Sequence, residues 1–434
     1  MLFYSTKHQS APADLEEVVM QGLPPDNGLY MPDVITPMPA GFWEEIDRLS
    51  FPEMSYRFAQ QLLQDSIPPD VLRRIVYDAV NFEAPVVKLS EQLACLELFH
   101  GPSLAFKDFG ARFMARMMAY FVQHARQKLY ILVATSGDTG GAVAQGFLGT
   151  PGIEVIILYP SGKISELQEK QLTTLGNNIT ALEVQGTFDD CQHLVKQAFL
   201  DQELRSRLNI SSANSINLAR LIPQAFYYIY AWAQVKNTGK PVVFCVPSGN
   251  FGNLTAGLLA KRMGLPANHF VAANNANDVF THYHRHGQFL PRPSVQTYSN
   301  AMDVGNPSNL QRIQDLYGNN LENIRKDVSA YSFTDAQTIT AMQHAYSRFG
   351  YVMCPHTAVG YLGINAYFEQ HPQPNAMGIF LGTAHPAKFL DVVEPALQIT
   401  VPIPQNLQAL ANRQKVATPM STHFADFKEY LEGR

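Results

Sequence analysis

The strongest constraint on the fold is a short apolar run that leads directly into a glycine- and asparagine-rich turn. Residues 242–246 are Val-Val-Phe-Cys-Val, residues 247–253 are Pro-Ser-Gly-Asn-Phe-Gly-Asn, and an apolar, helix-like segment begins at Leu254. A strand that enters a helix through such a turn leaves free N–H groups pointing outward, and the helix dipole favours negative charge there. The turn matches neither G-x-G-x-x-G nor G-x-x-x-x-G-K-[ST]. It therefore predicts a phosphate site for something other than a dinucleotide or a nucleoside triphosphate.

The composition predicts a compact, soluble protein with more than one lobe. The chain has 434 residues, of which 46% are hydrophobic and 16% are charged, so we expect two or three lobes rather than one core. A net charge of −5 without a basic stripe predicts no nucleic-acid partner. No apolar run approaches the roughly 20 residues that span a bilayer, which predicts no membrane partner. Residues 1–8 lack the apolar region of a signal peptide, and the four cysteines share no C-x-x-C spacing. We expect a cytoplasmic enzyme with reduced, buried thiols.

Buried strands alternate with helical patterns along the chain. Phe109, Phe113, Met117 and Phe121 recur at every fourth residue and predict a helix from Asp108 to Arg126. A second helix is expected over 218–236, with a break near Pro223. Continuous apolar runs indicate parallel strands covered on both faces, which together predict an α/β fold with open parallel sheets; besides 242–246, these runs are 128–135, 155–159, 270–273 and 378–381.

One lysine stands beside phenylalanines at the start of the first of these helices. Residues 103–110 are Ser-Leu-Ala-Phe-Lys-Asp-Phe-Gly, so Lys107 lies in apolar surroundings. Loss of solvation lowers the pKa of such a lysine, and its neutral amine can attack an aldehyde. The alternative, which is commoner in general, is a lysine whose ammonium reaches solvent. Together with a phosphate turn that matches no nucleotide motif, Lys107 favours pyridoxal 5′-phosphate as the cofactor.

Two further turns follow predicted strands. Residues 135–141, Thr-Ser-Gly-Asp-Thr-Gly-Gly, suit a carboxylate or another anion at a helix N-terminus, although these residue types are also ordinary helix caps. Thr383 follows the last strand, where open α/β sheets bind ligands. We expect its hydroxyl to meet the pyridine nitrogen of the cofactor.

These motifs and several other stretches closely resemble the threonine synthase family, of the longer type found in bacteria and fungi, within the fold-type II pyridoxal-phosphate enzymes. The lysine and the phosphate turn are shared across fold type II and indicate only the cofactor. Residues 22–32 and 301–309 narrow the resemblance to threonine synthase. The similar stretches span nearly the whole chain and are 4–6, 22–32, 100–108, 134–141, 248–253, 301–309 and 355–360.

The resemblance implies a tryptophan synthase β-like fold, with two open-sheet α/β lobes, the cofactor between them and an N-terminal segment. We expect residues 1–98 to form the N-terminal segment and part of the large lobe. Residues 99–213 would form the small lobe and 214–434 the large lobe. Within the latter, a lid-like insertion is expected at about 275–332, because this stretch is poor in strand signals. Relatives of this type suggest a monomer.

The resemblance also implies a pyridoxal-phosphate-dependent carbon–oxygen lyase acting on phosphates. It would convert O-phospho-L-homoserine and water to L-threonine and phosphate, by γ-elimination and then β-addition of water, in the last step of threonine biosynthesis. Carried over by position, Lys107 would hold the cofactor covalently and move protons, and Thr383 would face the ring nitrogen. The residues that would bind the cofactor's phosphate are Gly249, Asn250, Phe251, Gly252 and Asn253.

The substrate's own phosphate needs a second anion site. Lys163 and Ser165 follow a predicted strand and are one candidate; Asn214 with Arg220 is another. Lys163 could equally be an exposed loop lysine, and for Arg220 a structural ion pair is slightly preferred. Many fold-type II relatives have an asparagine where Asp138 stands, so a carboxylate there could need a basic neighbour. The residues expected to border the substrate carboxylate or the cofactor ring are Ser136, Asp138 and Thr139.

Two alternatives to this function remain open. A β-replacing enzyme or dehydratase acting on serine or threonine would keep the fold and the cofactor, and a second phosphate site argues against it. A non-catalytic, ligand-binding relative would be favoured by loss of the lysine, and Lys107 is present. His282, His284 and His286 alternate as metal ligands on a strand would, but surface histidines are favoured, so no metal site is predicted. His385 beside Thr383 could contact the ligand or serve packing.

Overall fold

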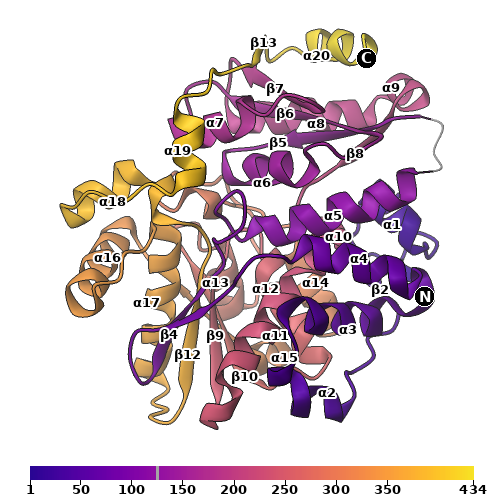
Figure 1. Ribbon diagram of the computed structural model, residues 1–434. Coiled ribbons are helices and arrows are strands. Elements are labelled where there is room, and N and C mark those ends of the chain that lie inside the picture. Colours follow the sequence, from indigo (N-terminus) through magenta and orange to yellow (C-terminus); the bar gives the residue numbers. More distant parts are fainter. Residues whose placement is uncertain (124–126) are drawn as a thin grey trace.

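The computed structural model describes residues 1–123 and 127–434, which form two lobes around separate sheets (Figure 1). The larger sheet has six strands in the order β11-β10-β9-β12-β4-β3. All neighbours are parallel except β3, which runs antiparallel to β4. The strands are β3 (Val86–Lys88), β4 (Leu93–Glu97), β9 (Val242–Pro247), β10 (Ala267–Asn274), β11 (Val328–Ser332) and β12 (Met377–Gly382).

The second sheet has five strands, all in parallel pairs, in the order β13-β7-β6-β5-β8. β13 comes from the C-terminal end of the chain, which runs from the lower lobe to the upper one (Figure 1). The five-stranded sheet therefore contains a strand from beyond residue 214, where we expected the small lobe to end. The strands are β5 (Leu129–Ala134), β6 (Ile153–Pro160), β7 (Ile179–Val184), β8 (Asn209–Ser212) and β13 (Thr418–Met420). A separate antiparallel pair joins β1 (Phe3–Ser5) to β2 (Tyr30–Pro32).

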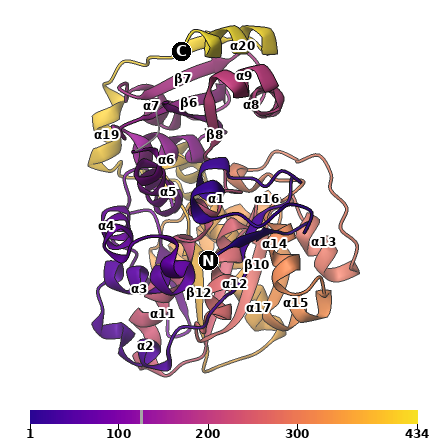
Figure 2. The same cartoon turned by 90° about the vertical axis from the view of Figure 1, so that its right-hand side faces the viewer.

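The apolar runs predicted as parallel strands are confirmed as β5, β6, β9, β10 and β12. Every residue of β5, β9 and β12 is buried, because helices cover both faces of the sheets. Figure 2 shows the lobes one above the other, with α5 and α6 on the side of the upper lobe that faces the lower one. The four cysteines are free and buried, as predicted.

The helices follow the predicted pattern where it was clearest. α5 (Lys107–Val122) carries the stripe of phenylalanines; residues 124–126 of that prediction lie outside the described residues. Pro223 separates α10 (Leu218–Leu221) from α11 (Gln224–Val235), as expected. The other helices of the core region are α1 (Leu15–Gln21), α2 (Ala40–Glu45), α3 (Phe51–Leu63), α4 (Pro69–Ala79), α6 (Asp138–Phe147), α7 (Glu166–Thr173), α8 (Phe188–Leu200), α9 (Gln202–Arg207), α12 (Gly252–Arg262), α16 (Asp335–Phe349), α17 (Pro355–Gln370), α18 (Leu390–Leu397), α19 (Gln405–Ala411) and α20 (Phe424–Glu432).

The segment over 275–332 contains more regular structure than its composition suggests. It holds α13 (Val279–His286), α14 (Leu310–Leu316) and α15 (Leu321–Asp327), and it ends in β11 at the edge of the larger sheet. The alternating histidines lie on helix α13, so the idea that they share one face of a strand is wrong. Within residues 1–123 and 127–434, no cluster of three or more His, Cys, Asp or Glu side chains could hold a metal ion. No helix in this part of the chain has the length and apolar character needed to cross a membrane.

Candidate active site

Lys107 is held at the carboxyl end of the larger sheet by the backbone just before it. The Phe106 N–H donates to the Thr383 carbonyl over 2.9 Å, and the His385 N–H donates to the Leu104 carbonyl over 3.0 Å. These bonds tie the start of α5 to the segment that follows β12. The structure therefore brings together Lys107 and Thr383, which are far apart in the sequence.

The surroundings of the Lys107 amine favour its neutral form. Its Nζ donates a hydrogen bond to Thr139 Oγ1 over 2.9 Å. The pKa of Lys107 is lowered to about 8, mainly because the amine is buried; the positive charges of Arg220 and Lys388 contribute to this shift, and the carboxylate of Asp138 opposes it. A substantial fraction of neutral amine near pH 8 is what attack on an aldehyde requires.

The turn after β9 forms a cup of free backbone amides. Phe251 adopts the left-handed conformation with φ of 60°, and α12 starts at the next residue. Within the described residues, none of the N–H groups of residues 249–253 has a hydrogen-bond acceptor. A Cβ at Gly249 would come within 2.7 Å of Met302 Cα, so only glycine fits there. An aldehyde-reactive lysine near a cup of amides at a helix N-terminus fits the aldehyde and the phosphate of pyridoxal 5′-phosphate.

Asn250 connects this cup with two other loops. Its Nδ2 donates to Ser215 Oγ over 2.6 Å, and its Oδ1 accepts from the Ser308 N–H over 2.6 Å. Ser215 adjoins Asn214, a predicted substrate residue, and Ser308 lies in the 301–309 stretch. The predicted cofactor and substrate segments thus meet at one side chain.

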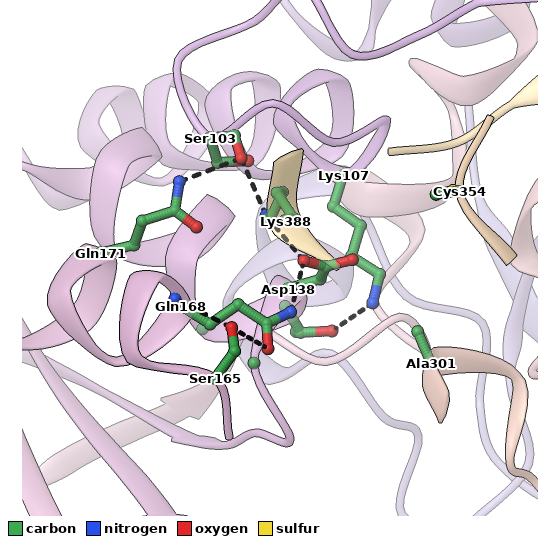
Figure 3. A network of polar contacts seen from close by, with 12 residues as sticks. Ser103, Lys107, Asp138, Ser165, Gln168, Gln171, Ala301, Cys354 and Lys388 are labelled. Atoms are coloured by element: carbon green, nitrogen blue, oxygen red, sulfur yellow. Dashed lines mark hydrogen bonds and ion pairs between the residues drawn. The ribbon is translucent and has the colours of Figure 1, made fainter. Parts of the chain in front are cut away.

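A buried ion pair occupies the other side of the site (Figure 3). Lys388 Nζ lies 2.6 Å from Asp138 Oδ1, and Gln168 Nε2 donates to the same oxygen over 3.1 Å. Burial by itself would raise the pKa of Asp138, but the charges of Lys388 and Lys107 hold it well below its usual range. The expectation that a carboxylate at this position needs a basic neighbour is met by Lys388.

In the described part of the chain, Arg220 is a buried cation without a carboxylate partner. It is 4% exposed, its Nη1 donates to the Ala213 carbonyl, and its Nε has no hydrogen-bond partner. Among the described residues no carboxylate lies within 4 Å of its guanidinium, so the structure does not contain the expected ion pair. Burial lowers the pKa of Arg220 to about 10, although Asp108 partly opposes the shift. A buried charge of this kind is costly unless an anion joins it.

Of the other predicted residues, some lie within the site and some lie outside it. Thr139 contacts Lys107, and Ser165 caps α7 and contacts Gln168, which holds Asp138. Lys163, by contrast, is exposed in the loop after β6. His385 accepts from the Ala387 N–H and packs edge-on against Phe99, which favours the packing role.

Sequence reasoning missed four buried residues of the site. Lys388 and Gln168 surround Asp138, as described above. His356 Nε2 accepts from the Ala301 N–H over 3.1 Å, and Arg312 donates to the carbonyls of Tyr30 and Ile216. The need of Asp138 for a basic neighbour pointed to Lys388 in principle, but its position in the chain carried no signal.

Three protein-family models match the chain in succession. The model of the threonine synthase N-terminus matches residues 2–80. The model of pyridoxal-phosphate-dependent enzymes matches residues 83–379, and the C-terminal threonine synthase model matches residues 357–431. The cup, Lys107 and the Asp138 loop all lie within the second match.

Individual relatives agree over the full length. The threonine synthase of Serratia marcescens is 42% identical over 437 residues, which cover 100% of this chain and 99% of the relative. The crystal structure of threonine synthase from Escherichia coli is similar with a TM-score of 0.91 at 41% identity, over 100% of both chains. A PLP-bound threonine synthase from Brucella melitensis gives a TM-score of 0.94 at 33% identity, over 100% of this chain and 99% of that one. The chain therefore belongs to the threonine synthase family, within the pyridoxal-phosphate-dependent enzymes, and uses pyridoxal 5′-phosphate as its cofactor.

Proposed function

We propose that this chain converts O-phospho-L-homoserine and water to L-threonine and phosphate, the last step of threonine biosynthesis. The observation that carries the proposal is the presence of two separate anion sites near one lysine. The free amides of residues 249–253 suit the cofactor's phosphate, and the unpaired guanidinium of Arg220 suits a second anion. A phosphorylated substrate supplies that second anion, whereas serine and threonine do not.

In this proposal Lys107 has two roles. Its amine holds the cofactor, which, when bound, accepts the electron pair left at the substrate's Cα. The released amine then takes the proton from Cα, helps remove a second proton from Cβ, and returns a proton to Cγ after phosphate leaves. Its lowered pKa keeps the amine neutral often enough for these transfers, and Thr139 orients it through a 2.9 Å hydrogen bond.

The substrate's phosphate is assigned to Arg220 together with Asn214 and Ser215. Arg220 lies close enough to Lys107 to lower its pKa, and Asn250 links Ser215 to the cofactor cup. Ser136 and Thr139, at the start of α6, are assigned to the substrate carboxylate, and Thr383 to the cofactor's ring nitrogen. Lys163 and Ser165 are weaker candidates for the phosphate, because Lys163 is exposed and Ser165 caps α7.

Product analysis tests the proposed reaction. Purified protein with pyridoxal 5′-phosphate should release phosphate from O-phosphohomoserine in step with threonine. It should form little pyruvate from serine and little 2-oxobutyrate from threonine, whereas a dehydratase would give the reverse. Lys107→Ala should abolish phosphate release, and a variant that retained it would overturn the role of Lys107.

We also propose two lobes that enclose the cofactor, a monomer, a cytoplasmic location and no nucleic-acid partner. The four buried, unpaired cysteines support a reducing compartment, and the formal charge of −5 argues against nucleic-acid binding. Sedimentation of the purified chain tests the monomer directly.

A further inference from the structure

The ion pair of Asp138 and Lys388 is almost completely enclosed. The two side chains are 5% and 1% exposed, and 2.6 Å separates Asp138 Oδ1 from Lys388 Nζ. Lys388 also donates to the carbonyl of Ser103, four residues before Lys107, over 2.9 Å (Figure 3). It thereby joins the loop after β12 to the start of α5 and to α6. Removing one partner from a buried pair leaves the other charge uncompensated.

Each member of the pair acts on Lys107 with the opposite sign. The carboxylate of Asp138 stabilises an ammonium at position 107, and the ammonium of Lys388 destabilises one. Asp138 alone would therefore favour the protonated, unreactive form of Lys107. An asparagine at position 138 would not need the cation, but it would also lose the carboxylate's capacity to accept several hydrogen bonds.

We propose that Lys388 is a positioning residue that balances the charge of Asp138, so that Asp138 can accept hydrogen bonds in the site without drawing a proton onto Lys107. The proposal rests on Lys107 being the cofactor lysine. It assigns a role to a residue that lies five positions beyond Thr383, that pairs with Asp138, and that opposes the effect of Asp138 on Lys107.

The other ionisable groups around the pair keep a constant charge near neutral pH. His356, on α17, faces Asp138; burial lowers its pKa to about 4, so it is neutral. Cys354 also faces Asp138, and burial raises the pKa of its thiol, so it is neutral too. Arg220 remains a cation, and burial raises the pKa of Asp108, which faces Lys388, to about 6. Between pH 7 and pH 9 the balance at Lys107 therefore depends on Asp138 and Lys388.

The test uses the holoenzyme and three variants: Asp138→Asn, Lys388→Met and the double variant. The readout is the pH midpoint of the visible absorption band that a lysine-linked cofactor gives. Asp138→Asn should lower this midpoint and Lys388→Met should raise it, each by about 1 pH unit or more. The double variant should titrate between Asp138→Asn and the wild type, because Asp138 acts on Lys107 more strongly than Lys388 does. Lys128→Met removes a surface lysine that pairs with Glu154 over 3.0 Å, and it should leave the midpoint unchanged.

A purely structural role predicts a different pattern. Shifts in the same direction for the two single variants, or no shift in either, would overturn the proposal. If Lys388→Met does not fold, the double variant and Asp138→Asn still test the proposal. The midpoint of the double variant should then lie at a higher pH than that of Asp138→Asn. Failure of the proposed function is distinguishable: it would appear in the products, as pyruvate from serine or 2-oxobutyrate from threonine in place of threonine and phosphate from O-phosphohomoserine. Failure of this inference alone leaves those products unchanged and the band dependent on Lys107.

Discussion

The side-chain amide of Asn250 donates a hydrogen bond to the hydroxyl of Ser215 over 2.6 Å. The same amide's oxygen accepts from the Ser308 N–H, so one side chain connects the cup, the Asn214 loop and the 301–309 stretch. The proposed phosphate sites of cofactor and substrate consequently share a support. A substitution at Asn250 should therefore weaken binding at both phosphate sites.

Replacing Asn250 with alanine should weaken the binding of both the cofactor and the substrate. Loss of two hydrogen bonds at about 1 kcal/mol each predicts a rise of about tenfold or more in the cofactor's dissociation constant and in KM. Titration of the cofactor-free chain and steady-state kinetics measure these values. Asn237→Ala, which removes an exposed amide that contacts Asp47, is the matched control. An effect on only one of the two constants would contradict the shared support.

Replacing Arg220 with methionine should affect the phosphorylated substrate above all. Loss of a buried guanidinium that receives the phosphate should raise KM by at least about tenfold, while cofactor binding stays near the wild-type value. Competition by inorganic phosphate should weaken in parallel. Arg74→Met, at an exposed arginine 3.6 Å from Asp70, serves as control. An unchanged KM together with lost stability would assign Arg220 a structural role.

Arg312 should matter for stability more than for chemistry. It is completely buried, and its guanidinium donates to the carbonyls of Tyr30 and Ile216 and to Asn309 Oδ1. Arg312→Met leaves these buried acceptors without a hydrogen-bond donor, and it should lower the free energy of unfolding by about 2 to 4 kcal/mol. Urea unfolding measures this, with the exposed Arg348→Met expected to change it by less than about 0.5 kcal/mol. Equal effects of the two substitutions would refute the interpretation.

The lowered pKa of Lys107 predicts a specific pH dependence in the cofactor-free chain. Its pKa is about 8 in the fold and 10.5 in the unfolded chain, so between these values the unfolded chain binds more protons and stability rises with pH. Below pH 8 the buried ammonium costs about 3 kcal/mol. Lys107→Met should therefore stabilise the cofactor-free chain more at pH 7 than at pH 10. Thermal unfolding at both values is the measurement, and a pH-independent difference would contradict a lowered pKa.

The sequence could predict the parts of the site that are contiguous in the chain. The cup at 249–253 follows a buried strand and precedes a helix, and Lys107 begins an amphipathic helix, so local patterns were sufficient for both. The parallel strands were also recognisable, because burial on both faces produces unbroken apolar runs. The resemblance to a known family then supplied the reaction.

The rest depends on contacts between distant residues, which local patterns do not encode. Lys388 meets Asp138 across 250 positions, and nothing near Lys388 in the sequence distinguishes it from a surface lysine. Arg312 lies in a polar stretch that looks like a surface excursion, yet it is fully buried. The alternation of His282, His284 and His286 imitates a strand, but the segment is a short helix packed beside β11.

The most direct test of the account is to reduce the holoenzyme with borohydride and map its peptides. The peptide that contains Lys107 should carry a reduced pyridoxyl group, and Lys107→Ala should carry no such label. A label on another lysine such as Lys388, or an unlabelled Lys107 in active enzyme, would contradict it.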